Sequence, residues 1–192
     1  MMQLFGYISA ILSIIMVVPY IRDIFLLKTK PERASWFIWT VLGVISFASQ
    51  FAKGATDSLW LTAGQTLAVA IVFILAIKYG TGGLEKRDKI ALIIAIFGLM
   101  LWYFTQEAAY ALLLVIFIDS VGSLLTIIKS YQAPETETVS TFVLSGTSGI
   151  FGALAVGNFN FILLAYPLYI VLANYSIVAA ILLGRNKKIA IH

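Results

Sequence analysis

Asp119 is the residue whose type and position most clearly predict chemistry. It lies in the middle of an apolar run, about ten residues from either end. A carboxylate at that depth costs roughly 2.5–3.5 kcal/mol on insertion scales, so such residues face the interior of a helix bundle or a water-filled cavity. Asp119 could carry a proton, bind the hydroxyls of a substrate or a cation, or serve as a structural acceptor for neighbouring Ser and Thr side chains.

Three further polar residues interrupt apolar runs and are candidate substrate ligands. Asn174 follows Pro167 by seven residues, and a proline frees a backbone carbonyl inside its helix. The Asn174 amide could bind a ligand or hold two helices together by a hydrogen bond. Gln65 and Ser148 are second choices. Ser148 also forms a small-xxx-small pair with Gly152, which is typical of close helix packing.

A candidate gate or hinge lies where the first apolar run ends. Pro19 is the expected bend, and Arg22 and Asp23 follow one turn later. These two could be an interfacial arginine and its counter-ion, or an inner gate that closes on Ser, Thr or Glu of the second half of the chain. Trp36 begins the next run and could anchor it at the membrane interface or stack on a substrate ring.

The residues for catalysis or metal binding are missing from the sequence. His192 is the only histidine and there is no cysteine, so we find no HExxH motif and no Ser/His pair. We therefore predict no catalytic residues, no metal site and no cofactor, and we do not expect an enzyme.

The composition sets the class of protein that must position these side chains. Hydrophobic residues make up 61% of the chain and charged residues only 11%, against about 25% charged residues in a soluble domain. So few charges cannot cover a water-facing surface, so we predict an all-α integral membrane protein. Runs long enough to span a bilayer, roughly 20 residues, occur seven times: about 4–27, 36–52, 59–79, 89–105, 108–129, 139–157 and 160–184.

The basic residues predict the orientation of these seven spans. With the N-terminus outside and the C-terminus in the cytoplasm, Lys53 alone remains outside. The cytoplasmic side then receives all the others: Arg22, Lys28, Lys30, Arg33, Lys78, Lys86, Arg87, Lys89, Lys129, Arg185, Lys187 and Lys188. The net charge of +4 is thereby explained by membrane topology, and we expect the bilayer rather than nucleic acid as the partner.

Two copies of one helix–hinge–helix unit organise the chain. Aligning Pro31 with Pro134 also aligns Gly54 with Gly157. We therefore predict a first three-helix bundle over 1–80, a linker helix over 81–107, and a second bundle with a short basic tail over 108–192. The extra span makes the two bundles parallel, as in one class of transporter repeats.

These features carry a resemblance. The segment PYIRDI (19–24) followed by KTKP-x-R-x-SWFIW (28–39), within a 3+1+3 layout, resembles the SWEET and PQ-loop transporter superfamily, and more closely some bacterial seven-helix membrane proteins of that type. The resemblance implies alternating access by two bundles around a central site. It matches Pro19 to the family's first-helix proline and Asn174 to its seventh-helix asparagine, whereas Ser120 stands where a second proline is expected.

The sequence thus predicts a transporter of the bacterial inner membrane that moves a small polar solute, sugar-like or vitamin-like. The alternative is a seven-helix receptor or scaffold that binds a ligand or partner without transport. Proton coupling and homo-oligomer formation stay open at this point.

Overall fold

The fold is seen in a computed structural model. It describes residues 1–29, 31, 33–80, 89, 93, 96–97, 100, 104 and 108–189. Most of the predicted linker helix over 81–107, with Lys86, Arg87 and Trp102, lies outside the described residues, as do Lys30 and Glu32 of the first hinge.

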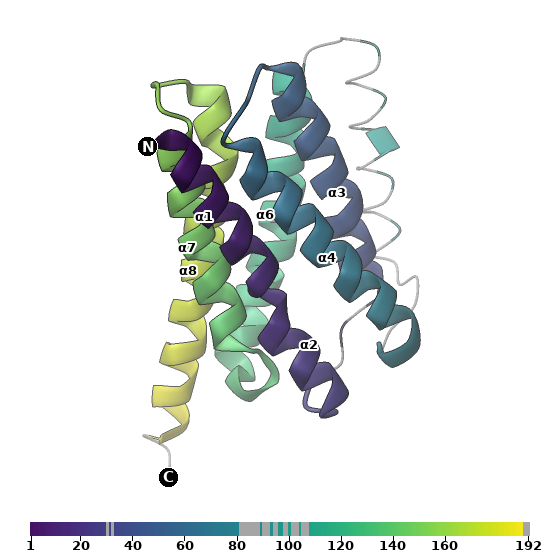
Figure 1. Ribbon diagram of the computed structural model, residues 1–192. Coiled ribbons are helices and arrows are strands. Elements are labelled where there is room, and N and C mark those ends of the chain that lie inside the picture. Colours follow the sequence, from purple (N-terminus) through teal and green to yellow (C-terminus); the bar gives the residue numbers. More distant parts are fainter. Residues whose placement is uncertain are drawn as a thin grey trace.

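The described residues form helices and connecting turns, with no strand among them, as the sequence predicts. In chain order the elements are α1 (Met2–Ile15), α2 (Val17–Phe25), α3 (Arg33–Ala52), α4 (Leu59–Tyr79), α6 (Ala108–Gln132), the 3-10 turn η1 (Pro134–Thr136), α7 (Val139–Ala155) and α8 (Phe161–Ile189). The start of α1 and the end of α8 lie at opposite ends of the bundle (Figure 1).

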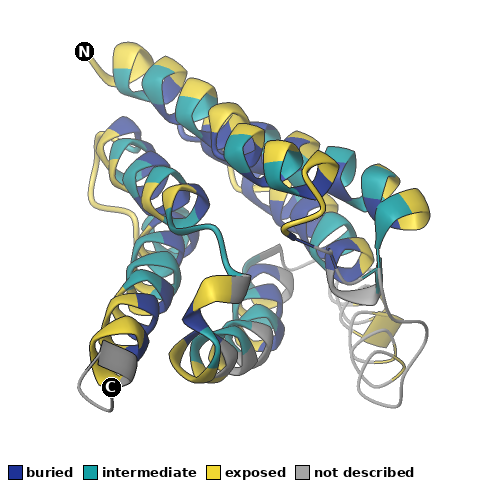
Figure 2. Ribbon diagram, turned by 90° about the horizontal axis from the view of Figure 1, so that it is seen from below, coloured by how far each residue is buried: buried dark blue, intermediate teal, exposed yellow. Residues whose placement is uncertain are grey.

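Three helical segments in the described part of the chain are long and apolar enough to cross a membrane: Met2–Phe25, Leu59–Tyr79 and Phe161–Lys187. Their outer surfaces are apolar as well. Large hydrophobic side chains are exposed at helical spacing, such as Leu67, Ile74 and Ile77 on α4 and Leu113, Phe117 and Leu124 on α6. Figure 2 shows exposed residues on the outward sides of the helices and buried residues on the sides that face neighbours. Soluble monomers rarely expose such continuous apolar surfaces, so this surface is suited to lipid.

Among the described residues, six long helical segments pack as a closed ring. Following the main contacts from α1, which continues into α2, the order is α4, α3, α6, α8 and α7, and α7 returns to α1 (Figure 1). Helices from the first part of the chain therefore meet helices from the second part mainly at two places, α1 against α7 and α3 against α6, with smaller contacts of α2 and α4 with α7.

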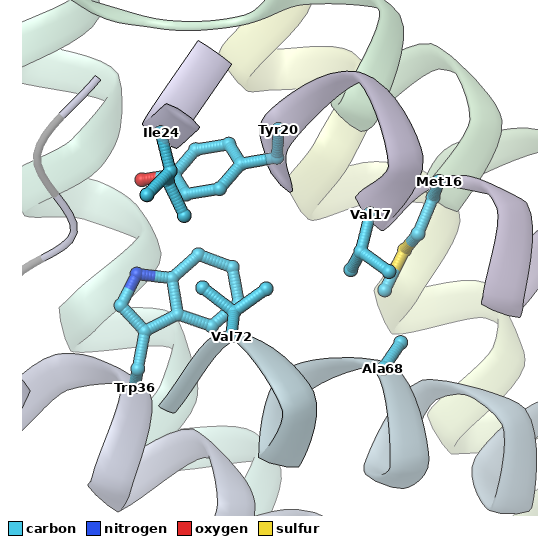
Figure 3. Packing of buried hydrophobic residues seen from close by; sticks show 7 residues of the cluster. All are labelled: Met16, Val17, Tyr20, Ile24, Trp36, Ala68 and Val72. Atoms are coloured by element: carbon cyan, nitrogen blue, oxygen red, sulfur yellow. The ribbon is translucent and has the colours of Figure 1, made fainter. Parts of the chain in front are cut away.

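A compact apolar cluster fills the space between α1–α2, α3 and α4. Tyr20 and Trp36 lie with ring centroids 5.0 Å apart, and Ile24 and Val72 are fully buried beside them (Figure 3). Because Met16 and Trp36 belong to this cluster and also line the central cavity described below, the cluster fixes one wall of that cavity.

The first membrane segment is interrupted beside that cavity. α1 ends at Ile15 and α2 begins at Val17, so the break lies at Met16, three residues before Pro19. Pro19 has no N–H and cannot donate to the carbonyl of Ile15, which weakens the helix at this point. By contrast, α6 is continuous around Ser120, whose hydroxyl donates to the carbonyl of Ile116 at 2.6 Å.

Two glycines end helices in the left-handed region. Gly54, with φ 78°, follows α3, and Gly157, with φ 77°, follows α7. These are the two glycines that the internal alignment pairs. A residue with a Cβ pays roughly 1–2 kcal/mol in this conformation, so glycine suits both positions. Leu27 adopts the same region (φ 57°) without that freedom.

Candidate functional site

A cavity of about 110 Å³ lies inside the ring of helices. Each of the six helical segments contributes to its wall, for example through Met16, Leu42, Thr66, Val115, Phe142 and Ile177. Most of the lining is apolar. The polar side chains on it are few, and they are mainly those that the sequence singles out or that hydrogen-bond to them.

Asp119 lies on this wall, as expected of a carboxylate at mid-membrane depth. The hydroxyl of Tyr169 on α8 donates a short hydrogen bond to its Oδ2 atom. The indole ring of Trp39 on α3 lies beside the same carboxyl group. Ser123, one turn along α6, shares a hydrogen bond of 3.0 Å with the Tyr169 hydroxyl. Asp119 therefore has structural partners, and it also borders an open space that could hold a ligand.

Gln65 joins the two parts of the chain across the cavity. Its Nε2 atom donates to the Ser145 hydroxyl on α7 at 3.2 Å, and its Oε1 atom accepts from the Tyr166 hydroxyl on α8 at 3.1 Å. Gln65 is 5% exposed, so each of these bonds satisfies a polar atom that has little access to water. A change in the distance between α4 and α7–α8 would therefore stretch or break the hydrogen bonds of Gln65.

Asn174 lines the cavity one turn from Ile170. Its Nδ2 atom donates to the Ile170 carbonyl at 2.8 Å, a bond within its own helix. This bond fixes the orientation of the amide on the cavity side of α8. The sequence left open an interhelical hydrogen bond for Asn174. Its amide nitrogen instead bonds within α8.

Thr141 lines the cavity and carries an unsatisfied polar atom. Its side chain is 5% exposed and lines the wall, and its hydroxyl has no hydrogen-bond partner among the described residues. A buried hydroxyl without a partner costs about 1–3 kcal/mol, which a bound ligand or water would recover. Thr141 is thus a described residue of the cavity wall whose hydroxyl lacks a hydrogen-bond partner.

Ser148 lies behind the cavity wall rather than on it. It is fully buried, its hydroxyl donates to the Ser145 carbonyl at 2.7 Å, and its own carbonyl accepts from the Ser9 hydroxyl at 2.8 Å. The bond from Ser9 holds α7 against α1. Gly152 also comes close to Leu61 of α4, so the small residues of α7 serve close packing, while Ser145 and Thr141 supply hydroxyls to the cavity.

The candidate gate residues lie in different surroundings. Trp36 lines the cavity, with its ring centroid 5.0 Å from that of Trp39 and the two planes at 84°. Arg22 is exposed, whereas Asp23 accepts a hydrogen bond of 2.8 Å from the hydroxyl of Thr138, the residue that precedes α7. Asp23 thus contacts a threonine of the second half of the chain, in the geometry that an inner gate would need.

The two hinges are the connections between α2 and α3 and between α6 and α7. A glycine near the end of a later helix packs against each hinge or the residue beside it. Gly80, after α4, lies against the Pro31 carbonyl, and Gly184 on α8 lies against the Tyr131 carbonyl. Arg33 strengthens the first contact by donating to the Ala76 carbonyl at 3.0 Å. Pro31 and Pro134 are both fully buried, so each hinge is held firmly in place.

The sequence did not single out Tyr166 or Tyr169 as site residues. A spacing signal exists for part of this set, since Tyr166, Ile170, Ala173 and Ile177 recur at helical intervals on the cavity side of α8. Tyrosines in membrane helices are more often interfacial anchors, so their type alone does not mark them as part of a site.

Comparison with known proteins adds no assignment. The chain matches no family model, no curated protein and no solved structure. The function therefore has to be argued from the cavity itself.

Proposed function

We propose that this chain is a membrane transporter that moves a small polar solute by alternating access between two three-helix bundles, in the bacterial inner membrane. The observation that carries this proposal is the central cavity, which α1–α2, α3 and α4 line from one side and α6, α7 and α8 from the other. A site shared in this way changes shape when one bundle moves against the other, which is how many transporters expose a fixed site to each side in turn.

The ring order supports the two-bundle interpretation. Exchanging α1 with α6, α3 with α7 and α4 with α8 leaves the order of neighbours in the ring unchanged. Pairs of residues 103 positions apart also take equivalent places: Pro31 with Pro134, Gly54 with Gly157, and Gly43 with Gly146. Gly43 lies close to Thr66 on α4, and Gly146 lies close to Tyr175 on α8. These pairs favour a duplicated bundle, with 81–107 as the linker that keeps both copies parallel.

The distribution of basic residues supports an orientation with the C-terminus in the cytoplasm. The ends of α2, α4 and α8 and both hinges lie at one end of the bundle, and the α3–α4 and α7–α8 connections lie at the other (Figure 1). Most of the Lys and Arg residues belong to the first group, and Lys53 belongs to the second. By the positive-inside rule, the first end faces the cytoplasm.

The proposal is tested by solute flux in liposomes that contain the purified full chain. We expect Asp119→Asn to lose solute uptake while its helix content and melting temperature stay close to those of the unmodified protein. Asp57→Asn, a matched change in the α3–α4 connection and away from the cavity, should leave uptake unaltered. Unchanged uptake kinetics in Asp119→Asn would remove Asp119 from the site, and a protein that binds a solute but never carries it across the membrane would be a receptor or scaffold.

A further inference from the structure

We propose that the cavity selects a small organic cation with an aromatic or apolar body, whose positive charge pairs with Asp119. This assigns a solute class to the central site and so rests on the proposed function for its physiological meaning. The binding preference itself can be measured whether or not the protein transports the solute.

The charge balance of the cavity is the first argument. Asp119 is the only acidic residue among the described residues that line the wall, and none of those residues is Lys, Arg or His. The described hydrogen-bond donor to the carboxyl group is a neutral one, the hydroxyl of Tyr169. A carboxylate in an apolar site takes up a proton unless a positive partner stabilises its charge, so the ionised form of Asp119 favours a guest that brings one.

Aromatic rings next to the carboxyl group are the second argument. Trp36 and Trp39 meet nearly at right angles, 5.0 Å apart, on the cavity wall. Trp39 lies beside Asp119 on this wall, so one indole ring is next to the carboxyl group. An ammonium bound to Asp119 would thus lie near an indole ring, where cation–π attraction adds roughly 0.5–2 kcal/mol. Phe142 and Val69 extend the apolar wall for the rest of the guest.

The supply of hydrogen-bonding groups separates this guest from a sugar. A sugar carries many hydroxyls, and each would need a partner in the site. Most polar groups on the wall are already bonded to each other, including Gln65, Tyr166 and Asp119. Asp119 uses its Oδ2 atom to accept from Tyr169, and Asn174 uses its amide nitrogen within α8, so acceptors for one donor group remain on the wall. A primary ammonium can donate to Asp119 and to the Asn174 amide oxygen and leaves few polar atoms unsatisfied.

The size of the cavity sets the size of the guest. Its volume of about 110 Å³ is of the same order as the roughly 150 Å³ apolar cavity that takes up benzene. One six-membered ring with a short charged arm is therefore a suitable probe.

The test uses three ligands that share one ring and differ in charge: benzylammonium, benzyl alcohol and benzoate. Binding to the full chain is measured by titration calorimetry in phosphatidylcholine nanodiscs at neutral pH, with empty nanodiscs subtracted. We expect benzylammonium to bind at least tenfold more tightly than benzyl alcohol and benzoate to give no binding. In Asp119→Asn the preference for benzylammonium over benzyl alcohol should fall to about one, while Asp57→Asn should keep it.

Several results would overturn the inference. They are equal or tighter binding of benzyl alcohol or benzoate by the unmodified protein, no binding of benzylammonium, or an undiminished preference in Asp119→Asn. The comparison of three ligands on the unmodified protein stands even if Asp119→Asn fails to fold.

A flux assay separates this inference from the transporter proposal. If glucose crosses liposome membranes through the protein and benzylammonium does not bind, the cation assignment falls and the transporter remains. If benzylammonium binds with the expected preference and neither solute crosses the membrane, transport falls and the cation site remains.

Discussion

The hydrogen bond between Thr138 and Asp23 should hold the inner ends of α2 and α7 together. The Thr138 hydroxyl donates to Asp23 Oδ2 at 2.8 Å and makes no bond to the first turn of α7, although a threonine before a helix commonly caps it. The hydroxyl therefore bonds across the two halves of the chain rather than within its own helix. In Thr138→Val this link is lost, while the side-chain shape is nearly preserved.

The size of the effect follows from the partners. A hydrogen bond to a charged group contributes about 1.5–3 kcal/mol, and both residues are partly exposed, so water reduces this to roughly 1–1.5 kcal/mol. If the bond exists only when the inner side is closed, its loss should raise the open fraction about five- to twelvefold.

A single introduced cysteine can report this change, because the natural chain has none. Ala173→Cys places a thiol on the cavity wall. In inside-out vesicles, a membrane-impermeant thiol reagent should modify it about five- to twelvefold faster when Thr138→Val is added. Thr138→Ser, which keeps the hydroxyl, is the matched control. Equal rates in the Val and Ser variants would refute the view that this bond closes the inner side.

Three substitutions test the packing and backbone arguments through unfolding in detergent. Leu27→Gly should raise the free energy of unfolding by roughly 0.5–1 kcal/mol, because it relieves the left-handed strain at an exposed residue; a lower melting temperature would contradict this. Gly54→Ala should lower it by about 1–2 kcal/mol through φ alone, since a Cβ there meets no neighbour within 4 Å, and an unchanged stability would argue against that conformation. Gly152→Ala should cost about 1–3 kcal/mol because the new methyl overlaps the fully buried Leu61, and Leu61→Val in the same chain should recover part of the loss; the absence of any recovery would place the clash elsewhere.

Much of the cavity was legible in the sequence because polar residues are costly inside a membrane. Asp119, Asn174 and Gln65 stand out in apolar runs, and all three line the cavity. The same cost argument does not separate a cavity wall from a helix interface, since both satisfy polar groups. Ser148 illustrates this point, because its hydroxyl bonds within α7, its carbonyl accepts from Ser9 of α1, and it lies outside the cavity lining.

The partners of these residues could not be predicted, because they depend on how the helices pack. Tyr169 reaches Asp119 across the α6–α8 contact, and Trp39 reaches it from α3. Both are amphipathic residues that are common at membrane interfaces, so their types gave no hint of this role. Helical periodicity gave little help for the fold either, since the lipid side and the core side of these helices are both apolar. The all-helical class followed from composition alone, whereas the ring order required the structure.

The interruption at Met16 should make α1–α2 easier to bend than α6. A loosened joint in α1–α2 can bend with little loss of backbone hydrogen bonding, whereas the unbroken α6 resists bending along its whole length. Any rearrangement around the cavity would then begin as a bend of α1–α2 about Met16, with α6 as the stiff support against which the bend is made.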